Sequence, residues 1–134
     1  MVYLVVSNRT MATRVLLVED DTLTRRNIAL YLRRSQFEVD EAASGEEAVR
    51  LITSIDEYDV CISDLRMSGL IDGMDVISHQ QRVSPGTSCF LVTAFGSDQL
   101  QKRAQEVNVI YLEKPVSLSD LLSKINASAT RNTP

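Results

Sequence analysis

The sequence predicts an α/β fold in which a parallel β-sheet is covered by helices on both faces. Five short apolar runs alternate along the chain with five segments of helical periodicity. Most of the apolar runs are continuous rather than alternating, which is typical of strands buried on both faces. The chain has 134 residues, and 44% of them are hydrophobic, which suits one domain with one core. Strand–helix alternation within this length favours parallel strands joined by right-handed crossovers.

The expected strands are the apolar runs. Residues 37–42, FEVDEA, alternate apolar and polar side chains, which favours a place near an edge of the sheet. The other four runs are continuous, as in a buried strand. In chain order the expected strands are 15–18, 37–42, 60–63, 89–93 and 109–112.

The helices are expected between and after these strands. The last segment has the clearest apolar stripe, formed by Leu118, Leu121, Leu122 and Ile125, and we interpret such stripes as core. Helix starts are marked by capping-box patterns in Ser44–Glu47 and Ser117–Asp120, where the serine side chain accepts from a backbone N–H. The expected helices are 22–34, 45–54, 74–83, 97–107 and 118–128.

The predicted organisation is one domain with short ends. We expect an N-terminal extension or vector remnant over residues 1–13, the folded domain over 14–128 and a polar tail over 129–134. Met11 is an alternative start, and Val2–Val6 is an alternative additional strand. No apolar run approaches the roughly 20 residues of a membrane span, and the start is a poor signal peptide.

Composition excludes several kinds of site. The net charge of −4 and the pI of about 4.9 argue against direct nucleic-acid binding by this domain, because such binding requires a basic patch. Cys61 and Cys89 lie inside apolar runs, and no CxxC pair or His/Cys cluster is present, which argues against a zinc site. We interpret both as buried free thiols of a reducing, cytoplasmic compartment.

Polar side chains gather where the expected strands end. Glu19 and Asp20 follow the first strand, Asp64 the third, Thr93 ends the fourth and Lys114 follows the fifth. In folds of this kind ligands bind beyond the carboxyl ends of the strands, so these side chains are expected to share one crevice. Three acids and one lysine leave two uncompensated negative charges, and carboxylate oxygens suit Mg²⁺ or Mn²⁺.

This charge pattern indicates a phosphoryl site. Mg²⁺ usually binds one or two carboxylates, several waters and a phosphate, so the cluster lacks a phosphoryl partner. Asp64 could then be the nucleophile of an acyl phosphate, with Lys114 and the Thr93 hydroxyl on other phosphoryl oxygens. Pro115 fixes the backbone after Lys114 and can take the cis form.

Four motifs in this order and spacing resemble the receiver domain of bacterial two-component response regulators. They are VLLVEDD, CISDLRM, LVTAFGS and YLEKPVS, and the resemblance covers residues 14 to about 128. It implies a flavodoxin-like, doubly wound (βα)5 fold with five parallel strands in the order 2-1-3-4-5.

The resemblance implies a metal and phosphoryl site. Asp64 aligns with the phosphoacceptor, and Glu19 and Asp20 align with the acidic pair that holds Mg²⁺. Arg66 occupies the position whose backbone carbonyl also binds the metal.

The resemblance also implies a switch and its partners. Thr93 and Lys114 match the hydroxyl and lysine that contact the phosphoryl group, and Tyr111 matches the aromatic switch residue that turns inward with the hydroxyl. The donor would be a sensor histidine kinase or phosphotransfer protein of a phosphorelay. The face made by the fourth helix, fifth strand and fifth helix would then change its binding to an output domain or protein, or in a homodimer. Only self-catalysed phosphoryl acceptance and autodephosphorylation are expected as chemistry.

The sequence departs from the family pattern after the third strand. Ser68 stands four residues after Asp64, where a proline is common. The glycine that commonly comes eight residues after the phosphoacceptor is Gly73, at nine, with Asp72 at eight. The loop SGLIDG is therefore expected to be one residue longer, and RRSQF lacks the usual glycine before the second strand.

Two other classes of function are alternatives. One is a protein-interaction module that has kept the fold and works without phosphorylation. The other is a phosphatase of the haloacid-dehalogenase type. Such a site requires a second aspartate two residues after the nucleophile, and Arg66 at that position argues against it. The sequence also lacks GxxxxGK[ST] and GxGxxG phosphate loops, which argues against nucleotide binding.

Overall fold

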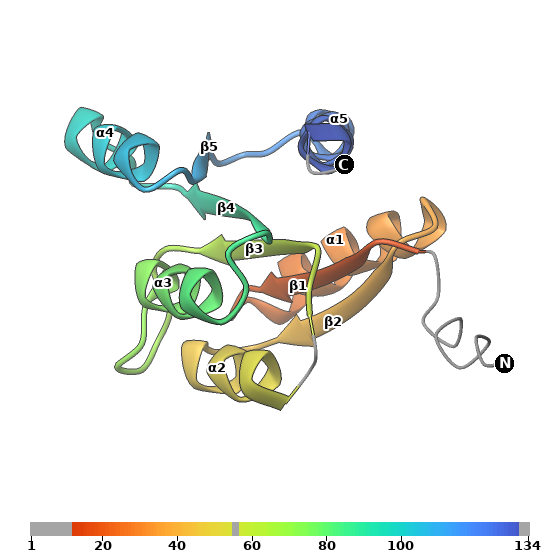
Figure 1. The fold of residues 1–134 in the computed structure, drawn as a ribbon, viewed down its shortest axis with the longest axis horizontal. Helices are drawn as coiled ribbons and strands as arrows, with labels where there is room; N and C mark the ends of the chain where they lie inside the picture. The colour runs from red at the N-terminus through yellow and green to blue at the C-terminus, as the bar shows by residue number, and fades with distance from the viewer. Residues whose placement is uncertain (1–11, 55–56, 132–134) are drawn as a thin grey trace, which may run out of the picture.

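The computed structural model describes residues 12–54 and 57–131, and this part of the chain forms a parallel sheet flanked by helices (Figure 1). The sheet has five strands in the order β2-β1-β3-β4-β5, so the predicted class and strand order are confirmed. The strands are β1 Arg14–Val18, β2 Glu38–Ala42, β3 Val60–Asp64, β4 Ser88–Thr93 and β5 Ile110–Glu113. The helices are α1 Thr22–Arg34, α2 Gly45–Ser54, α3 Gly73–Val83, α4 Asp98–Glu106 and α5 Leu118–Arg131.

The ends of the chain differ in what the structure describes. Residues 1–11 lie outside the described residues, and with them the proposed start at Met11 and the alternative strand Val2–Val6. At the other end α5 runs to Arg131, three residues beyond the expected limit. At the expected end of the helix the Ser128 hydroxyl donates to the Ile125 carbonyl at 2.9 Å and is buried, so this polar side chain has a partner inside the helix.

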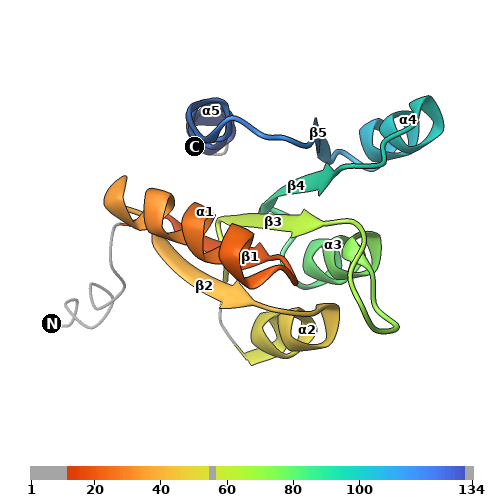
Figure 2. The same ribbon diagram turned by 180° about the vertical axis from the view of Figure 1, so that it is seen from behind.

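Two apolar layers cover the sheet, one on each face. Along β1, Leu16 and Val18 point into the layer under α2, α3 and α4, while Val15 and Leu17 point into the layer under α1 and α5. Figures 1 and 2 show α2 and α3 on one face and α1 on the other. The continuous apolar runs are therefore explained by burial on both faces.

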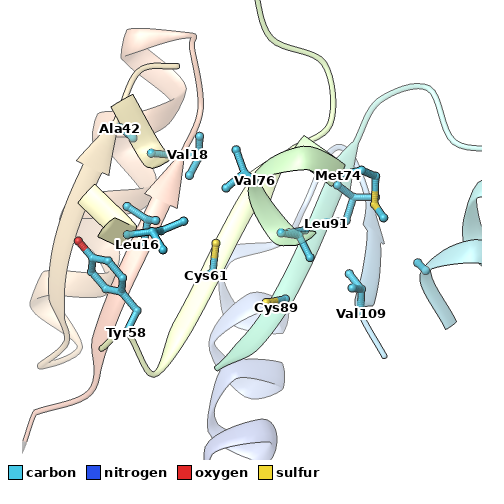
Figure 3. Close-up of a cluster of buried hydrophobic side chains, with 14 residues drawn as sticks. Leu16, Val18, Ala42, Tyr58, Cys61, Met74, Val76, Cys89, Leu91 and Val109 are labelled. Carbon is cyan, nitrogen blue, oxygen red and sulfur yellow. The ribbon is translucent and has the colours of Figure 1, made fainter. Parts of the chain in front are cut away.

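The two cysteines lie in the layer under α3 (Figure 3). Cys61 on β3 is the direct neighbour of Cys89 on β4, and both are buried free thiols, as predicted. A hydrogen bond with Cys89, together with burial, raises the pKa of the Cys61 thiol well above its usual value. Both cysteines are buried and act as core side chains, and the raised pKa keeps the Cys61 thiol protonated.

Helix starts follow the predicted capping pattern. The Glu47 N–H donates to the Ser44 hydroxyl at 3.1 Å, and the Asp120 N–H donates to the Ser117 hydroxyl at 3.3 Å. The helix α3 has a full capping box between Asp72 and its third helical residue. Among the described helices, none combines the length and apolar character that crossing a membrane requires.

The register of the strands brings their carboxyl ends to one edge of the sheet. Val18 pairs with Ser63, Asp64 pairs with Val92, and Thr93 pairs with Glu113. The residues that follow each strand are therefore neighbours in space, although they are far apart in the sequence.

Candidate functional site

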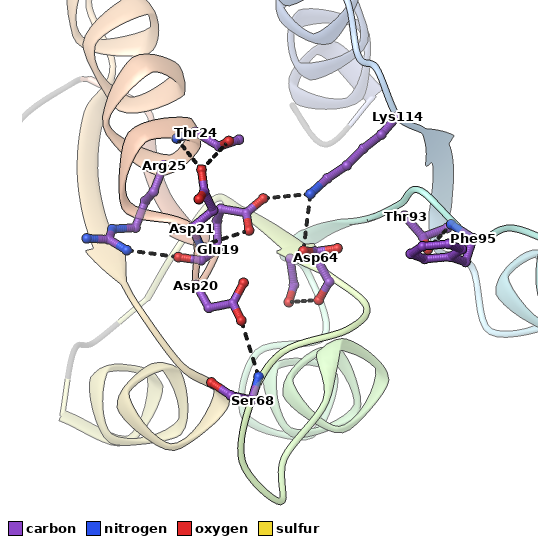
Figure 4. Close-up of polar contacts among 11 residues, drawn as sticks. Glu19, Asp20, Asp21, Thr24, Arg25, Asp64, Ser68, Thr93, Phe95 and Lys114 are labelled. Atoms are coloured by element: carbon purple, nitrogen blue, oxygen red, sulfur yellow. Dashed lines mark hydrogen bonds and ion pairs between the residues drawn. The ribbon is translucent and has the colours of Figure 1, made fainter.

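Three carboxylates form a cluster at the carboxyl edge of the sheet (Figure 4). Glu19 and Asp20 follow β1, and Asp64 ends β3; each offers an oxygen, and these oxygens all lie within 4.8 Å of one another. Glu19 is buried, while Asp20 and Asp64 are half-buried. The strand order explains the proximity, because β1 and β3 are adjacent.

A lysine reaches into this cluster from the end of β5. The Nζ of Lys114 lies 2.8 Å from Oε1 of Glu19 and 3.1 Å from Oδ2 of Asp64. The following Lys114–Pro115 bond is cis, the form that the sequence had suggested. The Lys114 side chain, at the end of β5, thus links the carboxyl ends of β1 and β3, which both lie on the same side of β5 in the sheet.

The charges in the cluster do not balance. Burial raises the pKa of the Glu19 carboxyl, and its hydrogen bond from Lys114 only partly opposes the rise. Burial alone would lower the pKa of Lys114, but its hydrogen bonds to Glu19 and Asp64 and their charges raise it instead. Lys114 thus remains charged at neutral pH, and by formal charge three carboxylates and one ammonium leave an excess of two negative charges.

The donor set fits a hard divalent cation. The three groups are all carboxylates, with no nitrogen or sulfur ligand in the described cluster, and oxygen ligands suit Mg²⁺ or Mn²⁺. A divalent cation would also supply the missing positive charge. The cluster can therefore hold a metal of this class.

Local contacts fix the backbone that carries Glu19. Its N–H donates to the Ala42 carbonyl at 3.1 Å, and its carbonyl accepts from Nη1 of Arg25 at 3.0 Å. Two residues further along the chain, the Asp21 N–H donates to Oε2 of Glu19 at 3.2 Å. Asp21 also caps α1, and hydrogen bonds from Thr24 hold the pKa of its carboxyl below the usual value.

A glycine packs against the backbone of the candidate phosphoacceptor. A Cβ at Gly73 would overlap the carbonyl oxygen of Asp64, so only glycine fits here without a shift of the backbone. The Gly73 N–H donates to the Leu65 carbonyl at 2.9 Å, and the Leu65 N–H donates to Val92 on β4 at 3.0 Å. The longer loop therefore still returns a glycine to the end of β3.

The loop over residues 65–72 is anchored to two acids. The Ser68 N–H donates to Oδ2 of Asp20 at 3.2 Å, and the Leu70 N–H donates to Oε2 of Glu46 on α2 at 3.2 Å. Between them Gly69 has a φ of 105°, which favours glycine. The sequence showed that Ser68 replaces a common proline, but it did not show that its N–H contacts Asp20.

Thr93 and Arg66 lie at the same edge but do not join the acid cluster. The Thr93 hydroxyl oxygen accepts from the Phe95 N–H at 3.0 Å, and within the described residues no hydrogen bond links it to Asp64 or Lys114. The Arg66 guanidinium lies over the Phe95 ring, with Cζ 4.8 Å from its centroid. The role of the Arg66 carbonyl stays a prediction.

Tyr111 lies beside the loop that follows β4. A Cβ at Gly96 would overlap its hydroxyl, and that hydroxyl lies 3.5 Å from Oε1 of Glu113. Burial, followed by the Glu113 charge, raises the pKa of the Tyr111 phenol. Sequence reasoning singled out Tyr111 but missed Phe95, Gly96 and Glu113, for which no periodic pattern gave a signal.

The comparison with known families finds the response regulator receiver domain, which matches residues 15–126. The chain is 37% identical over 122 residues to "Transcriptional regulatory protein PdtaR" of Mycobacterium tuberculosis, covering 88% of this chain and 57% of that protein. It is 36% identical over 119 residues to "Cyclic di-GMP phosphodiesterase" of Thermotoga maritima, covering 88% of this chain and 31% of that protein. The chain thus spans less than two thirds of the length of these relatives.

The fold also matches solved structures. A response regulator receiver domain protein (CheY-like) from Methanospirillum hungatei superposes with a TM-score of 0.84 at 24% identity, covering 90% of this chain and 96% of that one. A receiver domain protein from Clostridium thermocellum gives a TM-score of 0.81 at 28% identity, covering 89% and 95%. The match to the Methanospirillum hungatei structure shows that the two chains share a fold.

Proposed function

This chain belongs to the response regulator receiver domain family, and on that premise we propose that Asp64 accepts a phosphoryl group in two-component signalling. Receiver domains act as signalling switches, so the proposal concerns a switch and not a metabolic enzyme. The donor would be a phosphohistidine of a sensor histidine kinase or phosphotransfer protein. Modification of Asp64 would then change the binding of an output domain or protein.

One observation carries this proposal: Lys114 bridges Glu19 and Asp64 within a cluster of three carboxylates. Such a cluster repels itself unless cations compensate it. Phosphoryl transfer needs mainly positioning and charge neutralisation, and the cluster offers a nucleophilic oxygen beside a fixed positive charge.

The residues of this chain have separate roles in the proposed transfer. An oxygen of Asp64 forms the new bond to phosphorus while the phosphorus–nitrogen bond of the donor breaks, and the donor imidazole leaves. Lys114 stays protonated and neutralises a phosphoryl oxygen. Glu19, Asp20, Asp64 and the Arg66 carbonyl would hold Mg²⁺, which supplies charge neutralisation at the phosphoryl oxygens.

The switch would involve groups that the structure shows engaged elsewhere. The Thr93 hydroxyl now accepts from the Phe95 N–H and would turn to donate to a phosphoryl oxygen. Tyr111 would then turn inward and alter the face formed by α4, β5 and α5. That face would bind the output partner or a second copy of the chain in a homodimer, in the cytoplasm.

Intact-mass measurement tests the proposal. The wild type is incubated with Mg²⁺ and acetyl phosphate, and a gain of one phosphoryl group is expected. The Asp64→Asn variant should show no gain. The matched variant Asp120→Asn, changed at an exposed residue on α5, should gain like the wild type, and EDTA should prevent the gain. An equal gain in Asp64→Asn, or none in the wild type, would contradict the proposal, and the second result would favour the phosphorylation-independent interaction module.

A further inference from the structure

Asp20 is held differently from the other two acids of the cluster. Glu19 and Asp64 both accept a hydrogen bond from Lys114. In the part of the chain that the structure describes, the hydrogen bond to the Asp20 carboxylate comes instead from the Ser68 backbone N–H at 3.2 Å (Figure 4). The loop after β3 therefore contacts the acid cluster through a side chain that is 48 positions away in the sequence.

This contact depends on the backbone of residue 68 and not on its side chain. A proline in this place, which the family commonly has, would carry no N–H and could not donate. Any other residue could donate in principle. The serine is therefore significant because it is not a proline, and its hydroxyl is not part of the contact.

The rest of the loop holds the Ser68 N–H in place. Two positions further on, the Leu70 N–H donates to Glu46 of α2 at 3.2 Å. The turn at Gly69, with a φ of 105°, lets consecutive parts of the loop reach Asp20 on one side and Glu46 on the other. Position 68 is thus fixed from α2 as well as from β1.

A carboxylate can accept this bond and still bind a cation. It has two oxygens with about four lone-pair directions, so a carboxylate whose Oδ2 accepts from Ser68 still has lone pairs for a cation. Fixing the side chain beforehand lowers the entropy cost of ligand binding. The hydrogen bond from the Ser68 N–H therefore favours cation binding because it orients the Asp20 carboxylate in advance.

We propose that the Ser68 backbone N–H is a positioning group that orients the Asp20 carboxylate toward a divalent cation and strengthens cation binding. The inference rests on the proposed function only in assigning Asp20 to the metal site. The contact between Ser68 and Asp20 makes the metal affinity of this receiver depend on the path of the loop over residues 65–72.

Calorimetric titration with Mg²⁺, without any phosphodonor, tests the proposal. The Ser68→Pro variant removes the N–H, and we expect its dissociation constant to rise about threefold, the effect of one side chain that is no longer pre-oriented. The Ser68→Ala variant keeps the N–H and should bind Mg²⁺ like the wild type. Glu46→Ala removes the second anchor of the loop and serves as the control for loop disturbance, with a smaller change than Ser68→Pro.

A second readout needs no metal. In the ¹⁵N-labelled wild type, the amide resonance of residue 68 should shift in Asp20→Ala, while that of Leu70 should shift in Glu46→Ala. An amide at 68 that does not respond to Asp20→Ala would overturn the proposal, and it does so even if Ser68→Pro folds poorly.

The outcomes separate this inference from the proposed function. Equal Mg²⁺ affinity in the wild type and Ser68→Pro, with phosphoryl uptake intact, overturns the positioning role alone. Weaker binding in Ser68→Pro together with no phosphoryl uptake by the wild type overturns the proposed function alone. A wild type that binds no Mg²⁺ at millimolar concentration overturns both.

Discussion

The two halves of the carboxyl edge are held in opposite ways. We call one the acid half, formed by Glu19, Asp20, Asp64 and Lys114, and the other the switch half, formed by Thr93, Phe95, Gly96, Tyr111 and Glu113. Lys114 bonds to Glu19 and Asp64, which are 95 and 50 positions away, and Asp20 accepts from the N–H of Ser68 in the adjoining loop, 48 positions away. In the switch half, the side-chain hydrogen bonds of Thr93 with Phe95 and of Tyr111 with Glu113 join residues only two positions apart.

The separation of the bonded residues along the chain indicates which half can rearrange while the sheet stays folded. The bonds of the acid half connect separate strands, so breaking them means displacing those strands or leaving charges unpaired. The bonds of the switch half are between near neighbours, so a side-chain rotation can exchange them. The edge therefore combines a fixed binding centre with an adjustable neighbour.

The largest expected effect comes from crowding the acid half. Gly73→Ala places a Cβ against the carbonyl of Asp64, and because the clash is with backbone, we expect the free energy of unfolding to fall by about 2–3 kcal/mol. Urea denaturation measures the loss. The matched control is Gly86→Ala, where a Cβ meets nothing within 4 Å, and its change should stay within about 0.5 kcal/mol. Equal effects of the two substitutions would contradict the tight packing at Asp64.

Removing the lysine should give the next largest effect. Lys114→Met keeps the apolar stem but leaves three carboxylates without a cation, and we expect a loss of about 1–2 kcal/mol. This is less than the roughly 3–5 kcal/mol for breaking a fully buried pair, because the Lys114 side chain is 28% exposed and solvent screens its charge. Urea denaturation with and without Mg²⁺ checks it, and Mg²⁺ should restore more stability to the variant than to the wild type. A variant as stable as the wild type would show that the acids do not need the lysine.

A glycine of the switch half should respond differently. Gly96→Ala also creates an overlap, but with the hydroxyl of Tyr111, the far end of a side chain. We expect less than about 1 kcal/mol of destabilisation and a shift of the Tyr111 ring resonances in NMR spectra. Repeating the substitution in Tyr111→Phe should reduce its cost. A loss as large as that of Gly73→Ala would show that the switch half is as rigid as the acid half.

The smallest expected effect is on the titration of Tyr111. Its phenol should titrate above the ordinary value of about 10, because burial and Glu113 raise its pKa, and Glu113→Gln should bring the pKa back toward that value. The neutral phenol is favoured in the folded state, so its stabilising contribution is complete below the unfolded pKa and is lost as pH rises through the folded one. The pKa of Tyr111 is measured in the wild type and in Glu113→Gln from phenolate absorbance. Each protein is compared with the same protein carrying Tyr111→Phe, and the difference is the Tyr111 signal. An unchanged midpoint in Glu113→Gln would remove Glu113 from the switch half.

Much of the fold was predictable because burial leaves a plain pattern. The run at 15–18 appears as β1 Arg14–Val18, and the helix expected at 22–34 appears with the same limits. Continuous apolar runs identified strands covered on both faces. The helix α5 ran further than expected because residues 127–131 have no apolar stripe that could mark its end.

The acid half was also predictable, whereas in the switch half only Thr93 and Tyr111 were expected and their side-chain contacts were not. Because parallel strands end at one edge, acids after β1 and β3 and Lys114 after β5 had to be neighbours. Where Thr93 directs its hydroxyl depends on a rotamer and on the path of one loop, and neither leaves a periodic pattern. The same holds for Arg66 over Phe95 and for the contact of Ser68 with Asp20.

The distance of Lys114 from its partners along the chain has a consequence for biosynthesis. A ribosome adds about 5–20 residues per second, so the 50 positions between Asp64 and Lys114 take roughly 3–10 s to make. During that time the residues of β1 and β3 have been synthesised, while the lysine has not been added. Wherever β1 and β3 pair before β5 is made, the three carboxylates meet without their lysine, and bound protons or a dissolved divalent cation would reduce the repulsion between them.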